Sequence, residues 1–214
     1  MDMKNRTLIF DLGGVLLDIF IDRSFGALMA LGMDASILTE KRCLMDDMIQ
    51  RYDRGDVSTA EFYSYIAQYL PQSVQALPED ELQERIHDIW NMMLGCFSRE
   101  KMEYIKTLRE RGNRVVMLSN TNEGHWETIE RLFRYTMGAP LSEFFDELYL
   151  SFEMNLRKPE PEIFESLLRS EGVEAADCIF FDDSEENCNA ARALGIEAVV
   201  MERNAAWNSL PVLE

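Results

Sequence analysis

The sequence predicts an α/β protein in which a doubly wound parallel sheet is interrupted by an inserted all-helical cap. Short, near-continuous apolar runs alternate with helical patterns over residues 98–201, and such runs are typical of parallel strands covered on both faces. Residues 18–95 show helical periodicity and no convincing strand. A length of 214 residues suits a compact core with a smaller insert and leaves little room for two unrelated domains.

Five strand-like segments, each bounded by turn residues, form the predicted sheet. They are residues 7–10, 114–118, 148–150, 178–181 and 198–200. Helical patterns lie between them. One follows Ser98 and ends at Gly112, a second follows Pro159 and ends at Gly172, and a third spans residues 184–195. This order predicts ligand binding at the carboxyl ends of the strands, where the sites of this fold class lie.

The helical insert has its own start signals and apolar faces. Ser58 followed by Glu61 has the pattern of a capping box, and it opens a helix with one apolar face. Apolar residues repeat at helical spacing again in the second half of the insert. We therefore predict that residues 1–17 and 96–214 form the core and that residues 18–95 form a helical cap.

Composition and charge narrow the class of protein. Apolar residues make up 47% of the chain and the net charge is -18, which suits a folded protein that does not bind nucleic acid or anionic membranes. No apolar stretch is long enough to cross a membrane, and residues 1–6 lack the features of a secretory signal, so we expect a cytoplasmic protein. We expect it to be a monomer or a homodimer. The four cysteines are Cys43, Cys96, Cys178 and Cys188. They form no CxxC pair, which argues against a zinc site and a redox motif, so we expect reduced and mostly buried thiols.

Reactive residue types follow the predicted strands. Asp11 follows the first strand and Ser119 the second. Lys158 lies just beyond the third strand, and Asp182 with Asp183 closes the fourth. Each residue alone would more readily be a helix cap, a turn or a surface charge. Together at one edge of a sheet they form a candidate site, in which a carboxylate such as Asp11 can act as a nucleophile and form an aspartyl-phosphate.

Four motifs in this order resemble those of the haloacid dehalogenase superfamily. They are FDLGGVL at residues 10–16, LSNTN at 118–122, RKPEP at 157–161 and FDDS at 181–184. Each motif is weak alone, but their order, spacing and strand context are specific together, and the resemblance covers nearly the whole chain. It implies a Rossmann-like core and a phosphoric monoester hydrolase that acts on a small phosphorylated metabolite.

The resemblance also implies a magnesium ion. Its ligands would be the Asp11 side chain, the Gly13 backbone carbonyl and Asp183. A cation is expected on physical grounds as well, because the nucleophilic carboxylate, the phosphate dianion and the negatively charged chain repel one another. Asp182 would orient a metal-bound water or pair with Lys158.

The charge that develops on the phosphoryl oxygens needs preorganised hydrogen-bond donors. The Ser119 hydroxyl, the Asn120 backbone and Lys158 are the candidates. We therefore assign catalysis to Asp11, Ser119 and Lys158, and substrate binding to Ser119, Asn120 and Lys158.

The chain departs from the phosphatases of this family at Gly13. They usually carry a second Asp at this position, which protonates the leaving group. Glycine keeps the backbone carbonyl for a metal but removes this help, so esters with acidic leaving groups, sugar 1-phosphates above all, are the expected substrates. In this respect the chain resembles the bacterial α-D-glucose-1-phosphate phosphatases.

Other interpretations stay open at this point. Loss of the second Asp also suits a non-catalytic protein that binds metal or phosphate. Haloacid dehalogenases lack the same Asp, although paired acids in the fourth motif are not expected of them. His125 either replaces part of the missing acid–base function or is a structural residue on a helix surface. Asp18 and residues 51–54 of the cap either face the substrate or are solvated.

Overall fold

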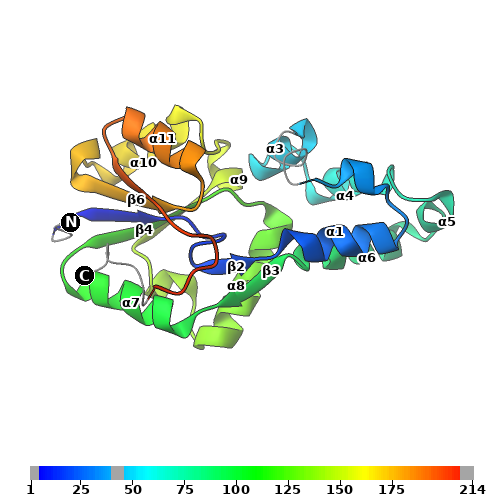
Figure 1. Cartoon of the computed structure of the whole chain (residues 1–214), viewed down its shortest axis with the longest axis horizontal. Helices are drawn as coiled ribbons and strands as arrows, with labels where there is room; N and C mark the ends of the chain where they lie inside the picture. Colours follow the sequence, from blue (N-terminus) through cyan, green and yellow to red (C-terminus); the bar gives the residue numbers. More distant parts are fainter. Residues whose placement is uncertain (1–4, 40–45, 208–214) are drawn as a thin grey trace.

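The core is a five-stranded parallel sheet. The structure is a computed structural model that describes residues 5–39 and 46–207. The strands are β1 (Thr7–Phe10), β4 (Arg114–Ser119), β5 (Glu147–Leu150), β6 (Cys178–Asp182) and β7 (Glu197–Val200). Their order is β5-β4-β1-β6-β7, every neighbouring pair is parallel, and β1 lies at the centre (Figure 1). The predicted sheet is confirmed, with strand ends that differ by at most one residue.

Helices cover both faces of the sheet, as expected of a doubly wound fold. One face carries α7 (Arg99–Glu110) and α8 (Glu123–Met137), and the other carries α10 (Pro161–Glu171) and α11 (Glu185–Ala193) (Figure 1). Successive residues of β1 point to opposite faces, so that Leu8 and Phe10 pack with the first pair of helices and Ile9 with the second. Burial on both faces explains why the central strands β1, β4 and β6 are nearly continuous apolar runs.

The ends of the core helices follow the signals in the sequence. The Ser98 side chain caps α7 by accepting a hydrogen bond from the Lys101 backbone N–H, and Ser184 caps α11 in the same way. Gly172 ends α10 in the left-handed conformation, with φ of 66°. The shorter helices of the core are η2 (Leu141–Glu143), α9 (Ser151–Met154) and η3 (Ala175–Asp177).

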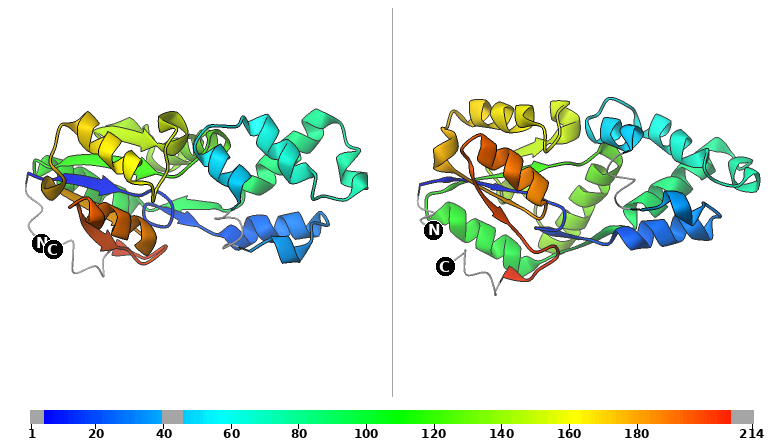
Figure 2. Two further views of the ribbon diagram at one scale, coloured as in Figure 1. Left: turned by 90° about the horizontal axis from the view of Figure 1, so that it is seen from above. Right: turned by 45° about the horizontal axis from the view of Figure 1, so that its top comes forward.

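The insert forms a second helical body with its own apolar core. Its helices are α1 (Ile21–Ala30), η1 (Ala35–Ile37), α3 (Asp47–Asp53), α4 (Thr59–Ala67), α5 (Gln72–Gln75) and α6 (Glu79–Asn91). The predicted capping box of Ser58 and Glu61 is present at the start of α4. Buried apolar side chains between Leu28 and Met93 pack these helices together, without any residue of the sheet. The insert projects from the carboxyl end of the sheet (Figure 2), and the division at residues 18–95 stays a prediction.

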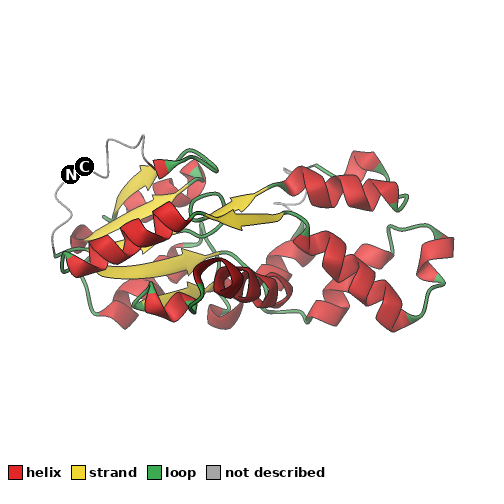
Figure 3. Ribbon diagram, turned by 90° about the horizontal axis from the view of Figure 1, so that it is seen from below, coloured by secondary structure: helices red, strands yellow, loops and turns green. Residues whose placement is uncertain are grey.

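Two short strands that the sequence did not predict connect the core to the insert. β2 (Leu17–Ile19) and β3 (Leu94–Phe97) pair antiparallel, with Leu17 opposite Phe97 (Figure 3). They are too short to show a periodic pattern, and β3 contains a glycine, a residue that is depleted in strands. The chain therefore enters and leaves the helical insert through one two-stranded ribbon.

Two further expectations can be compared with the described residues. Within residues 5–39 and 46–207, every helix is too short or too polar to span a bilayer. Cys178 and Cys188 are buried free thiols, Cys96 is an exposed free thiol, and Cys43 lies outside the described residues.

Candidate active site

Lys158 lies at the centre of the candidate site, where the carboxyl ends of β1, β4 and β6 meet. Its ammonium group donates hydrogen bonds to Asp11 Oδ1 at 2.7 Å, to Asp182 Oδ2 at 2.7 Å and to the Leu118 carbonyl at 2.8 Å. The Lys158 side chain is only 1% exposed. The three strands thus bring Asp11, the predicted nucleophile, into direct contact with the ammonium group of Lys158.

Asn120 holds the backbone of Lys158 in place. Its side-chain oxygen accepts a hydrogen bond from the Lys158 N–H at 2.9 Å, and its side-chain nitrogen donates to the Lys158 carbonyl at 2.8 Å. The second motif therefore positions the third. Ser119 is buried next to Asn120 and is not among the residues that line the site pocket, so its contact with phosphate stays a prediction.

Asp182 pairs with Lys158, which is one of the two roles predicted for it. Its carboxylate also accepts hydrogen bonds from the Ser184 backbone N–H at 2.8 Å and from the Asn187 side chain at 3.0 and 3.1 Å. These donors provide hydrogen-bond partners for both oxygens of a fully buried side chain. The sequence did not predict Asn187, whose only signal is its place on the first turn of α11, directly after the paired acids.

Three carboxylates form a candidate cation site. Ligand oxygens of Asp11, Asp182 and Asp183 all lie within 4.8 Å of one another. Hard divalent cations such as magnesium bind carboxylate oxygens, so this set of donors fits the predicted ion. Gly13 and Asp11 line one pocket, which is described below. Gly14 must be glycine, because its φ is 80° and a Cβ atom there would lie 2.6 Å from Asp183 Oδ2.

The charges around the carboxylates balance only in part. Burial raises the pKa of Asp11 to about 7, the Lys158 ammonium opposes this rise, and the carboxylates of Asp182 and Asp183 add to it. Burial alone would lower the pKa of Lys158, but the two carboxylates that it contacts outweigh burial and raise this pKa. Arg203 donates a hydrogen bond to Asp183 Oδ2 at 2.5 Å. A divalent cation would therefore stabilise this crowded set of acids.

The candidate site opens into a pocket of about 250 Å³ between the core and the cap. The core contributes Asp11, Gly13, Asn120, Lys158 and Asp183, which are five of the predicted site residues. The cap contributes side chains from α1, α3 and α6, and the ribbon contributes others. The pocket is therefore large enough for a small metabolite, with the reactive groups at its core end.

Of residues 51–54, Asp53 alone lines this pocket. Tyr52 is buried, and its hydroxyl accepts a hydrogen bond from the Gly124 backbone N–H at 3.0 Å. Arg54 forms an ion pair with Glu160 of the core. Arg51 and Asp18 do not line the pocket. Within the cap segment that the sequence singled out, Asp53 is thus the residue that faces the site.

His125 is buried, and not on the helix surface as predicted. Its ring stacks on Trp90, with centroids 5.3 Å apart. Nε2 lies 3.3 Å from the Trp90 carbonyl oxygen, and Nδ1 lies 3.5 Å from the Asn122 side-chain nitrogen. We assign the proton to Nε2, which donates to Trp90 while Nδ1 accepts from Asn122. Burial lowers the pKa of His125 to about 4, so the ring is neutral near pH 7.

The buried ring of His125 should make folding stability depend on pH. Below about pH 6.5 the unfolded chain gains a proton on this ring that the folded chain excludes, so stability is lost as the pH falls toward 4. The lost contribution is at most about 3 kcal/mol. In urea denaturation at pH 7 and pH 4.5, the His125→Gln variant should lose less stability than the wild type between the two pH values. Equal losses in both proteins would contradict this account.

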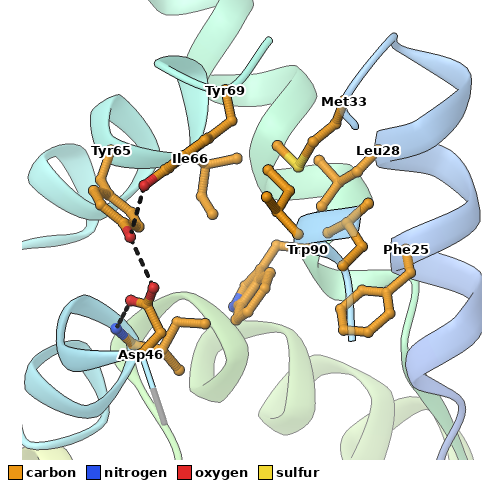
Figure 4. A pocket seen from close by; sticks show the side chains of 11 residues that line it. Phe25, Leu28, Met33, Asp46, Tyr65, Ile66, Tyr69 and Trp90 are labelled. Carbon is orange, nitrogen blue, oxygen red and sulfur yellow. Dashed lines mark hydrogen bonds between the residues drawn. The ribbon is translucent and has the colours of Figure 1, made fainter. Parts of the chain in front are cut away.

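A second, smaller cavity of about 50 Å³ lies inside the cap (Figure 4). Trp90 lines this cavity and also the site pocket. At its polar side, Tyr65 donates a hydrogen bond to Asp46 Oδ2 at 2.8 Å, and Tyr69 donates to the Tyr65 hydroxyl at 3.1 Å. Asp46, Tyr65 and Tyr69 are therefore paired with one another, and we assign the cavity to the packing of the cap.

Comparison with known proteins agrees with this geometry. The family model of haloacid dehalogenase-like hydrolases matches residues 5–195. The chain therefore belongs to the haloacid dehalogenase-like hydrolase family. It is similar to a D-ribitol-5-phosphate phosphatase from Bacteroides thetaiotaomicron, with 28% identity over 94% of each chain.

Solved structures show the same likeness over nearly the whole chain. A haloacid dehalogenase family enzyme from Bacteroides thetaiotaomicron, in complex with magnesium and inorganic phosphate, has a TM-score of 0.83 and 29% identity, and the match covers 97% of this chain and 99% of that one. A predicted hydrolase of this family from Porphyromonas gingivalis has a TM-score of 0.79 and 27% identity, with 95% and 94% covered. The predicted family, fold class and enzyme class, a phosphoric monoester hydrolase, are thereby confirmed.

Proposed function

We propose that this protein is a magnesium-dependent phosphatase that acts on a small phosphorylated metabolite through an aspartyl-phosphate at Asp11. The observation that carries the proposal is the contact of Asp11 with Lys158 at a sheet edge where two further carboxylates lie within 4.8 Å. A carboxylate nucleophile, a fixed ammonium group and oxygen ligands for a hard cation are the parts that phosphoryl transfer needs.

The residues of the chain divide the chemistry among them. Asp11 attacks phosphorus, and the ester oxygen leaves with the electron pair of the broken P–O bond. Lys158, held by Asn120, orients Asp11 and stabilises the charge on the phosphoryl oxygens. Magnesium, held by Asp11, Asp183 and the Gly13 carbonyl, would offset the repulsion between carboxylate and phosphate. Water then hydrolyses the aspartyl-phosphate and regenerates Asp11.

Two substrate classes have support. Gly13 provides no acid for the leaving group, and both ring nitrogens of His125 make contacts within the protein, so sugar 1-phosphates, which have acidic leaving groups, are favoured. Similarity favours D-ribitol 5-phosphate, the compound in the name of the Bacteroides relative. Hydrolysis of that ester releases a primary alcohol, and its rate depends more strongly on protonation of the leaving oxygen.

A panel of phosphate esters, assayed with magnesium and with a chelator, tests the proposed function. We expect turnover only with magnesium, and kcat values that rise with the acidity of the leaving group, from sugar 6-phosphates through sugar 1-phosphates to aryl and acyl phosphates. Rates that do not change with the leaving group would mean that another residue supplies the proton. Magnesium binding without turnover of any ester would support a binding protein instead, and halide release from 2-haloacids would support a dehalogenase.

Introducing an acid at position 13 should raise the rate for poor leaving groups selectively. The φ of Gly13 lies outside the left-handed region, and an added Cβ would lie 3.3 Å from Ile19 Cγ1, which a small shift of that side chain relieves. We expect Gly13→Asp to raise kcat for sugar 6-phosphates by about 10-fold or more and to change kcat for aryl phosphates little. Gly13→Asn is the matched control, because it adds a side chain of the same size that has no carboxyl proton to donate, and it should not raise kcat for any ester. Equal changes for all esters would contradict an acid–base role of this position.

A further inference from the structure

One part of the lining of the site pocket, here called the polar wall, consists of Asp53, Asn122 and Arg157. Asp53 and Arg157 have side chains that are 16% and 11% exposed, and both line the pocket together with Asn122. Asn122 Nδ2 donates a hydrogen bond to Asp53 Oδ1 at 3.2 Å. The ribbon and the start of α1 contribute apolar side chains such as Ile19 and Ile21. A molecule in the pocket therefore meets both hydrogen-bonding groups and hydrocarbon.

The hydrogen bonds of the polar wall are incomplete. Asp53 Oδ2 lies 3.9 Å from Arg157 Nη2, which is too far for a direct hydrogen bond. Arg157 Nε is buried and has no hydrogen-bond partner among the described residues. A buried polar group that lacks a partner, such as Arg157 Nε, is costly. A distance of 3.9 Å between Asp53 Oδ2 and Arg157 Nη2 is typical of a contact that a third group bridges. A hydroxyl group in the pocket can bridge the two, because it can donate to the carboxylate and accept from the guanidinium at the same time.

Asp53 sits on a part of the cap that is fixed to the core. Its backbone carbonyl accepts a hydrogen bond from the Ser151 hydroxyl at 2.5 Å. The carbonyl of the next residue, Arg54, accepts from the Asn155 side chain at 2.9 Å. Gly55 packs so closely on the core that a Cβ there would lie within 3 Å of the Phe152 carbonyl oxygen. The carboxylate is thus held at the pocket before any ligand enters, as selective recognition requires.

We infer that Asp53 and Arg157 determine specificity by binding a hydroxyl group in the part of the substrate beyond the phosphate. The inference rests on the proposed function and narrows its substrate class to polyhydroxylated esters, such as sugar or alditol phosphates, as opposed to alkyl or aryl phosphates. A site built to bind a hydroxyl group discriminates strongly against the analogue without one, because its own polar groups are then left unpaired.

Calorimetric binding of two matched ligands tests this inference. D-ribitol 5-phosphate and pentyl phosphate are both five-carbon primary esters, and only the first carries hydroxyl groups. In an Asp11→Asn background, which prevents turnover, we expect D-ribitol 5-phosphate to bind about 10-fold or more tightly than pentyl phosphate. Adding Asp53→Ala should remove most of this preference and leave the affinity for pentyl phosphate unchanged. Adding Asp53→Asn should keep part of it, and Asp56→Asn, an exposed neighbour, should keep all of it.

The outcomes separate the inference from the proposed function. Three outcomes would overturn the inference: a preference that survives Asp53→Ala, no preference in the Asp11→Asn protein with Asp53 in place, and equal losses of affinity for both ligands. The last would indicate a merely structural role. The proposed function is judged separately, by turnover of p-nitrophenyl phosphate by the wild-type chain and by the Asp53 single variants. Turnover in these proteins together with an unchanged ligand preference would refute only the specificity role.

Discussion

Replacing Asp11 with asparagine should lower kcat by roughly 10⁴-fold or more, because removal of a nucleophile leaves only binding and electrostatic contributions to the rate. The amide has the shape of the carboxylate, so the side chain still fits the buried site beside Lys158. Steady-state kinetics with the best ester of the panel would measure the loss. Circular dichroism and thermal denaturation would show whether the fold is kept.

A matched control for Asp11 is Asp56→Asn, which makes the same chemical change at an exposed position of the cap. This control should keep wild-type kinetics. Trapping of phosphate on the wild-type chain, and its absence from the Asp11→Asn protein, would identify the covalent intermediate. Substantial turnover by a folded Asp11→Asn protein would rule out the aspartyl-phosphate mechanism.

Lys158→Met should impair both turnover and stability. The ammonium group is the shared hydrogen-bond donor of the Asp11 and Asp182 carboxylates, and its removal leaves two buried acids without their counter-charge. Breaking a buried ion pair by removing one partner costs about 3–5 kcal/mol of stability. Loss of the fixed charge beside the phosphoryl group should lower kcat by a further factor of about 10² to 10³ in the molecules that stay folded.

Another buried lysine of the core provides the control. Lys101 is also buried, but its ammonium group donates to a carbonyl, that of Val15, at 2.6 Å. Lys101→Met therefore leaves no buried carboxylate unpaired, and its loss of stability should be clearly smaller than that of Lys158→Met. Urea denaturation of both variants at pH 7 gives the comparison. A Lys158→Met protein with wild-type kinetics would place this lysine outside the chemistry.

The sheet and the central residues of the site could be predicted from the sequence because each leaves a local signal. The central strands β4, β1 and β6 are buried on both faces, and this makes them nearly continuous apolar runs. Asp11 and Asp182 stand directly at strand ends, where parallel topology brings them together whatever the rest of the chain does. Lys158 could be placed near them only through the order of the four motifs.

The remaining parts of the site depend on contacts that leave no local signal. The approach of Asp53 to Arg157 joins the cap to the core across more than one hundred residues, and only packing of the two bodies determines it. The burial of His125 depends on Trp90 of the cap, so its own helix did not reveal it. The β2–β3 ribbon forms because its two strands pair with each other, although neither has a strand pattern of its own.

That ribbon also makes the cap a replaceable part. The chain leaves the core at Leu17 and returns at Phe97, which pairs with Leu17. The two ends of the insert therefore stay close together, whatever the length of chain between them. A cap of different size could be joined at the same two strands without moving Asp11 or Lys158. As related sequences diverge, the contribution of the cap to substrate selectivity can therefore change with the insert, while the residues of phosphoryl transfer stay with the sheet.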